Sequence, residues 1–222
     1  MDVIYHPFTQ DNNWIVLTFL FILALLVILK KLFRFRFNNQ LKLLNNTIWV
    51  SNLKNTYTII YNFYNLGYLI ILCFLLSFVT LVYIKYFTGL VVANSFYFFL
   101  KYSLYFSFFF ILKHLFYYLF SLVFSLKSLM LKVVYVKTSY LNFLSIFILS
   151  WLSFVLFSPF KSILIFKIAS IISLLLALYF YALIIKNNLK VVSKHFFYFI
   201  LYLCTLEIAP IIILYKVFFL KA

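Results

Sequence analysis

Long apolar stretches recur along this chain, and they constrain its fold more than any other feature. Each is about 20 residues long, which is the length an α-helix needs to cross the hydrocarbon core of a bilayer. The sequence therefore predicts an all-α integral membrane bundle of about six transmembrane helices, forming a single domain over residues 1–222. The predicted spans are 14–32, 66–86, 100–124, 140–158, 162–185 and 196–220.

Composition excludes a soluble protein. Apolar residues make up 68% of the chain and charged residues 10%, whereas about 25% of the residues in an average soluble domain are charged. The net charge is +16, but the Lys and Arg residues lie mostly in the short gaps between apolar stretches, where they act as topology signals. No basic segment carries a water-exposed aromatic platform, so nucleic acid is not expected as a partner.

The distribution of basic residues predicts the orientation in the membrane. The first span is followed at once by Lys30, Lys31, Arg34 and Arg36, whereas the segment before it carries Asp2 and Asp11. Cytoplasmic segments of membrane proteins carry the excess of Lys and Arg. We therefore expect an external N-terminus and a retained first span. In this topology Lys137 belongs to the inner connection between the third and fourth spans.

Residues 37–65 form an Asn-rich, mildly apolar connection after the first span. Its apolar residues recur at helical spacing, with Lys42 and Lys54 among them. This pattern favours a helix lying in the inner interface of the membrane. The alternative is a loop followed by an early start of the second span.

Glu207 is the only acidic residue beyond position 11, and it lies halfway along the predicted sixth span. A carboxylate in hydrocarbon is costly enough to be a functional-site hypothesis with a partner to be named. Lys113, near the middle of the predicted third span, is the expected partner because the midpoints of two spans lie at one depth. Such a pair would either fix helix register or form a site that binds or relays something; the third alternative is that the two residues make no contact. His114 follows Lys113 directly, and both can face protein, although adjacent helix residues cannot face one ligand in the same way.

Pro210 follows Glu207 by about one helical turn. Having no N–H, Pro210 leaves the carbonyl of Leu206 without its helical hydrogen bond and bends the backbone. Kinked backbone within a membrane is tolerated where protein groups or water satisfy it. With the hydroxyl of Thr205 close by, this segment suggests a polar pocket. The alternative is a kink that serves packing alone.

No catalytic or metal-binding pattern fits the chain. The three His residues lack the i, i+4 spacing of a zinc protease. Cys73 and Cys204 fall inside predicted spans without the spacing of metal ligands. The only other acids, Asp2 and Asp11, precede the first span. We therefore expect a protein that is not an enzyme and has no cofactor or metal.

The segment Tyr202-Leu203-Cys204-Thr205-Leu206-Glu207-Ile208-Ala209-Pro210 resembles the C-terminal signature of an uncharacterised membrane-protein family, named domain of unknown function 4271, of Bacteroidetes-type bacteria. The resemblance covers most of the chain, including the basic exit from the first span and a mid-chain span with a lysine, as at Lys113. It implies a protein of the inner membrane of a Gram-negative cell. Because the family has no assigned activity, the resemblance transfers no catalytic residue.

Bulky side chains and a small extramembrane portion are typical of a protein that works beside partners. Gly67 and Gly89 are the only glycines, so packing through Gly-xxx-Gly contacts is not expected. The sequence favours a non-enzymatic subunit or assembly factor of a larger cell-envelope complex, in contact with lipid and with other integral membrane proteins. In this interpretation a buried Glu–Lys pair organises the last helix. The alternative is a small transporter or proton-coupled component using Glu207 and Lys113.

Overall fold

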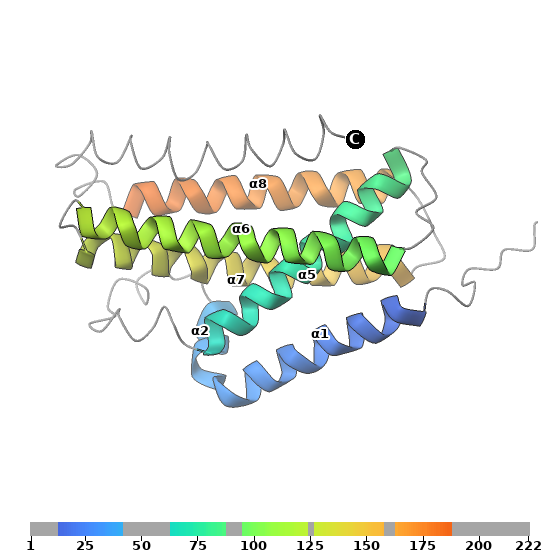
Figure 1. Ribbon diagram of the computed structural model, residues 1–222, viewed down its shortest axis with the longest axis horizontal. Coiled ribbons are helices and arrows are strands. Elements are labelled where there is room, and N and C mark those ends of the chain that lie inside the picture. Colours follow the sequence, from blue (N-terminus) through green and yellow to red (C-terminus); the bar gives the residue numbers. More distant parts are fainter. Residues whose placement is uncertain (1–12, 42–62, 88–94, 124–126, 158–162, 188–222) are drawn as a thin grey trace, which may run out of the picture.

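The computed structural model describes residues 13–41, 63–87, 95–123, 127–157 and 163–187 (Figure 1). Within these ranges every residue except Phe33 lies in an α-helix. The helices are α1 (Asn13–Leu32), α2 (Arg34–Leu41), α5 (Phe63–Phe87), α6 (Ser95–Val123), α7 (Lys127–Phe157) and α8 (Ile163–Asn187). The predicted all-α fold is confirmed.

Helices α1, α5, α6, α7 and α8 are each long and apolar enough to cross a membrane. They overlap the first five predicted spans, so the chain is a multi-pass membrane protein. The sixth predicted span, 196–220, lies outside the described residues. The same is true of Thr205, Glu207 and Pro210.

Helix α7 begins well before the span predicted from hydropathy. It starts at Lys127, whereas the predicted span starts at residue 140. Lysines and hydroxyl side chains lower the hydropathy of residues 127–139, but no Pro or Gly interrupts the backbone there. The placement of Lys137 in a connection was therefore wrong, because Lys137 lies inside α7.

Helix α5 occupies the centre of the described bundle. Half of its span is buried, against 17% for α1 and α6 and 11% for α8. Figure 1 shows α6, α7 and α8 running alongside one another while α5 crosses them obliquely. Helix α5 contacts α1, α6 and α7, and α8 packs against α7. The outer faces of α1, α6 and α8 are correspondingly rich in exposed apolar side chains.

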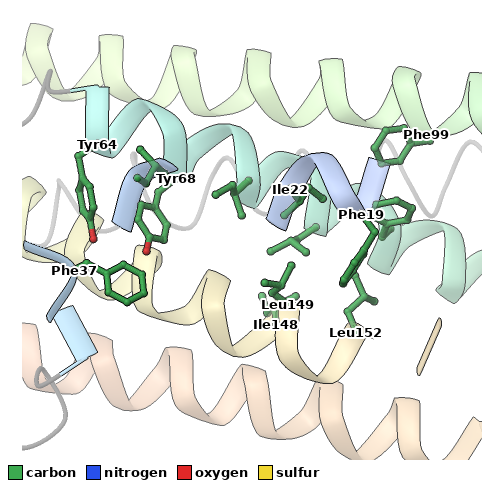
Figure 2. Close-up of a cluster of buried hydrophobic side chains, with 13 residues drawn as sticks. Phe19, Ile22, Phe37, Tyr64, Tyr68, Phe99, Ile148, Leu149 and Leu152 are labelled. Carbon is green, nitrogen blue, oxygen red and sulfur yellow. The ribbon is translucent and has the colours of Figure 1, made fainter. Parts of the chain in front are cut away.

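The main hydrophobic cluster joins α1, α2, α5, α6 and α7, and Figure 2 shows its central side chains. Ile22 and Leu152 within it are fully buried. Aromatic rings fill one end, where the ring centroids of Phe78 and Phe99 lie 4.6 Å apart and Trp14 stacks on Phe78 at 6.0 Å. Lipid tails are as apolar as these side chains, so close van der Waals packing is what holds the helices together.

The two helices α1 and α5 approach closely at Gly67. A Cβ atom added to Gly67 would lie 2.8 Å from both Cδ1 and Cδ2 of Leu29. Real Cβ contacts are not this short, so the side chain of Leu29 occupies the space that a larger residue at position 67 would need. This glycine therefore admits Leu29 into the α1–α5 contact.

Helix α2 follows α1 after a single turn residue, Phe33. The backbone N–H of Phe33 donates to the carbonyl of Leu29, and that of Phe37 donates to the carbonyl of Phe33, both at 3.0 Å. Helix α2 then packs against α7. A short helix thus follows the first span, and α5 begins at Phe63, slightly before the predicted second span. Residues 42–62 lie outside the described part of the chain.

Candidate functional site

Lys137 on α7 is a buried cation within the bundle, with 6% of its surface exposed. Its Nζ donates a hydrogen bond of 2.8 Å to the hydroxyl of Tyr117 on α6. The same Nζ lies 5.4 Å from the centre of the Tyr117 ring and 5.0 Å from that of Tyr181 on α8. Three helices therefore converge on one ammonium group.

The connection between α6 and α7 places Lys113 and Lys137 at the same distance along their helices. Lys113 lies ten residues before the end of α6, and Lys137 lies ten residues after the start of α7. The two helices are joined through residues 124–126 and pack against each other. At 1.5 Å per residue both lysines lie about 15 Å along their helices from this connection. The hairpin thus brings two lysines to one level.

The predicted residues Lys113 and His114 lie on the α6 side of the cluster, and both are half-buried. The ring centroid of His114 is 6.2 Å from that of Tyr117. Tyr117 therefore contacts both His114 and Lys137. The Nζ of Lys113 lies 5.9 Å from the centre of the Phe109 ring. Of the predicted pair, the structure places only the lysine, so the contact between Lys113 and Glu207 stays a prediction.

Within the described part of the chain, the charged side chains of the cluster formed by Lys113, His114, Tyr117 and Lys137 are the two lysines, and both are positive. All three acidic residues, Asp2, Asp11 and Glu207, lie outside the described ranges. A tyrosine hydroxyl and aromatic faces stabilise an ammonium, the faces by about 0.5–2 kcal/mol each, but they do not neutralise it. A carboxylate is the group that complements two such cations. In the described ranges no group of three or more His, Cys, Asp or Glu side chains could hold a metal ion.

Sequence reasoning missed Lys137 because the residue was counted among the loop lysines that set topology. A signal was present in the sequence. No Pro or Gly separates Lys137 from the apolar stretch that follows, so one helix can continue through it, and a lysine in a tyrosine-rich chain can bury its charge through cation–π contacts. The length of the apolar stretch alone does not reveal this, since Lys137 lies at its edge.

The family model described as "Domain of unknown function (DUF4271)" matches residues 15–218. No curated protein and no solved structure matches the chain. The matched range includes all five described spans almost in full, together with Lys113, His114, Lys137 and the segment that carries Glu207. The chain therefore belongs to the family described as domain of unknown function DUF4271.

Proposed function

We propose that this protein is a non-enzymatic subunit or assembly factor of a larger membrane complex of the bacterial cell envelope, located in the inner membrane. In this proposal a Glu–Lys pair organises the last helix of the chain. The observation that carries the proposal is the burial of Lys137 where α6, α7 and α8 meet. A cation held by three helices is a docking point for a further helix that carries an acid.

The predicted sixth span supplies that acid from the side of the membrane on which α6 and α7 are joined. Helix α8 ends at Asn187, and the predicted span starts at residue 196, so it would re-enter the membrane on the side where α8 ends. Glu207 lies eleven residues into the predicted span, about 17 Å along a helix. Lys113 and Lys137 lie only four and three residues inside the ends of their apolar spans, so their long side chains must extend toward the middle of the membrane to reach Glu207. Lys113 remains the predicted partner, and Lys137 is a second candidate because it is more deeply buried.

The outer faces of the described helices support a role beside partners. Only 17% of the α1 and α6 spans and 11% of the α8 span is buried within the chain. These faces are covered with large apolar side chains such as Leu104, Leu164 and Leu174. Faces of this kind contact lipid or the helices of other membrane proteins. A subunit uses such faces for assembly.

The experiment that tests this proposal is co-purification from native membranes after mild detergent extraction. We expect the tagged wild-type chain to retain partner proteins. Glu207→Gln, Lys113→Met and Lys137→Met should be compared, because each removes one charge. The matched control is Lys101→Met, which removes an exposed charge on α6. Under the proposal Glu207→Gln and at least one of the two buried-lysine variants lower both the membrane level and the partner yield.

A charge reversal sharpens this test. We expect Glu207→Lys combined with Lys137→Glu, or with Lys113→Glu, to restore the membrane level that each single reversal lowers. Restoration by one combination identifies the partner lysine. The proposal is wrong if Glu207→Gln abolishes complementation of a deletion strain while membrane level and partner yield stay at the wild-type value.

Loss of complementation by Glu207→Gln at a normal membrane level and partner yield would favour the second candidate function. This candidate is a small transporter or proton-coupled component using Glu207 and Lys113. The observation in its favour is the row of polar groups from His114 through Tyr117 to Lys137. Such a row can pass protons when an acid completes it. Purified protein reconstituted into vesicles with an internal pH dye would then show proton flux that Glu207→Gln abolishes. A wild-type flux equal to that of empty vesicles would exclude the proton-coupled function.

A further inference from the structure

A small polar cavity lies between α2, α5 and α7, away from the lysine cluster. Its volume of about 10 Å³ is close to the space that the centre of one water molecule needs. Polar side chains from all three helices line it. Helix α2 supplies Arg36 and Gln40, α5 supplies Tyr64 and Asn65, and α7 supplies Tyr135 and Asn142.

The side-chain amide oxygens of this cavity already accept hydrogen bonds. The hydroxyl of Tyr64 donates to Oε1 of Gln40. Nδ2 of Asn142 donates to Oδ1 of Asn65 at 3.2 Å, which joins α7 to α5. Figure 2 shows the hydroxyl of Tyr64 directed toward the side where Phe37 of α2 lies. The cavity is therefore a built polar site with fixed side chains.

Two buried hydrogen-bond donors at this cavity are unsatisfied. Nη1 of Arg36 and Nε2 of Gln40 are both buried and have no hydrogen-bond partner. Gln40 as a whole is only 3% exposed. Buried polar groups in native proteins are nearly always paired, and exceptions call for a bound water or ion. The hydroxyl of Tyr68, which interacts with Gln40, is also buried and unsatisfied. A hydroxyl both donates and accepts, whereas the guanidinium of Arg36 only donates, so the missing partner of Arg36 is an acceptor.

Charge favours an anion over water as this acceptor. The guanidinium of Arg36 is always protonated. Neighbouring turns carry the exposed cations Lys30, Lys31 and Arg34. None of the described residues is acidic, so nothing in the described part of the chain balances these charges. Water would satisfy the donors, but an anion would satisfy both the donors and the charge.

The position of the cavity relative to the apolar spans points to phosphate. Arg36 lies four residues after the α1 span ends, Tyr64 is the second residue of the α5 span, and Tyr135 is the second residue of the α7 span. The cavity is therefore at the edge of the apolar layer, on the side where the first span ends. Phospholipid phosphates are the most abundant anions at this depth, and basic pockets between transmembrane helices bind such headgroups.

We propose that Arg36 and Gln40 bind one oxygen of a phosphate group, carried either by a phospholipid headgroup or by free inorganic phosphate. The cavity admits a single oxygen atom, and the remainder of the phosphate group lies at its mouth beside Arg36. The guanidinium suits phosphate because its charge is permanent and its Nη1 donates to that oxygen. Gln40 adds a neutral donor from the next turn of α2.

Native mass spectrometry of the full chain, released from detergent, tests this site by counting retained phospholipids. We expect the wild-type protein to retain one phospholipid. Arg36→Gln and Gln40→Leu should each lower the retained fraction by about tenfold or more, the effect of losing a charge-assisted hydrogen bond. Arg34→Gln is the matched control, because it removes the same charge from an exposed position two residues away on α2.

A second arm distinguishes the source of the phosphate. If delipidated wild-type protein gains thermal stability with inorganic phosphate but not with nitrate, and Arg36→Gln does not, the ligand is free phosphate. If Arg36→Gln fails to fold, Arg36→Lys keeps the charge and is expected to show a reduced retained fraction. The proposal is overturned if Arg34→Gln lowers retention as much as Arg36→Gln does. It is equally overturned if neither phospholipid nor phosphate binds, which leaves water as the occupant.

Discussion

At the scale of single residues, the buried ammonium of Lys137 is stabilised by the hydroxyl and the aromatic ring of Tyr117. In the sequence Tyr117 is one of many aromatic residues, and nothing marks it as the partner of Lys137. Tyr117 is itself buried, and its hydroxyl is the hydrogen-bond acceptor that the structure places on Nζ of Lys137. Hydrogen bonds to charged groups contribute about 1.5–3 kcal/mol. The ring beneath contributes a cation–π attraction that does not need the hydroxyl. The two contributions can therefore be separated by substitution.

Tyr117→Phe should lower the free energy of unfolding in detergent by about 1.5–3 kcal/mol, because it removes the acceptor and keeps the ring. Unfolding monitored by circular dichroism or by a thermal shift measures this change. Tyr105→Phe serves as the control, since Tyr105 is exposed on the same helix. An equal effect of the two substitutions would mean that the hydroxyl of Tyr117 does not stabilise Lys137.

At the scale of helices, α1 and α5 pack through a glycine that makes room for a leucine. Gly67→Ala places a Cβ 2.8 Å from both terminal carbons of Leu29, which must shift. Overpacking costs about 1–3 kcal/mol, and the better helix propensity of Ala offsets about 0.5–1 kcal/mol of it. We expect a net destabilisation of about 1 kcal/mol in a detergent unfolding assay.

The partner substitution makes this prediction sharper. Leu29→Ala alone should destabilise the protein by about 2–5 kcal/mol, because it opens a cavity in the α1–α5 contact. The double variant Gly67→Ala, Leu29→Ala should be more stable than the sum of the single effects, since the new methyl group enters that cavity. Strict additivity would show that the two positions do not contact each other.

Helices α5 and α7 are joined by the hydrogen bond from Asn142 to Asn65. Buried side-chain hydrogen bonds between membrane helices contribute about 0.6 kcal/mol on average and about 1.7 kcal/mol at most. A double-mutant cycle with Asn142→Leu and Asn65→Leu should therefore give a coupling energy in this range, measured by unfolding in detergent. Ser150→Ala is the control on α7, because the exposed hydroxyl of Ser150 donates only to its own helix. A coupling energy of zero would contradict the contact.

At the scale of the whole molecule, the basic residues after α1 predict which ends of the helices face the cytoplasm. In a background with Cys73→Ser and Cys204→Ser, we expect Asn13→Cys to react with a membrane-impermeant maleimide on intact spheroplasts. Arg34→Cys, at the other end of the first span, should react only after permeabilisation. Both side chains are exposed, so accessibility reports the side of the membrane. The reverse pattern would invert the topology.

The membrane fold was predictable, because long apolar stretches permit few other structures. The burial of Lys137 and the cavity at Arg36 could not be predicted from the sequence, and the physical reason differs between the two. The sequence pattern places Lys137 among the topology signals, whereas tertiary contacts with Tyr117 and Tyr181 bury it. The cavity at Arg36 depends on how α2 packs against α7, which no local pattern specifies. A partial signal lay in Tyr135, Ser139 and Asn142, whose i, i+4, i+7 spacing places them on one helix face.

The central position of α5 has a consequence for the order in which the chain enters the membrane. The most extensive contact of α5 is with α6, which leaves the ribosome later. The α5 span has a mean hydropathy of 2.5 and can partition into lipid alone, whereas the α6 span has 1.4 and carries Lys101, Lys113 and His114. Helix α6 therefore inserts at lower cost once α5 is already in the bilayer to receive it. We therefore expect the most buried helix of the bundle to assist the insertion of its least apolar neighbour during synthesis.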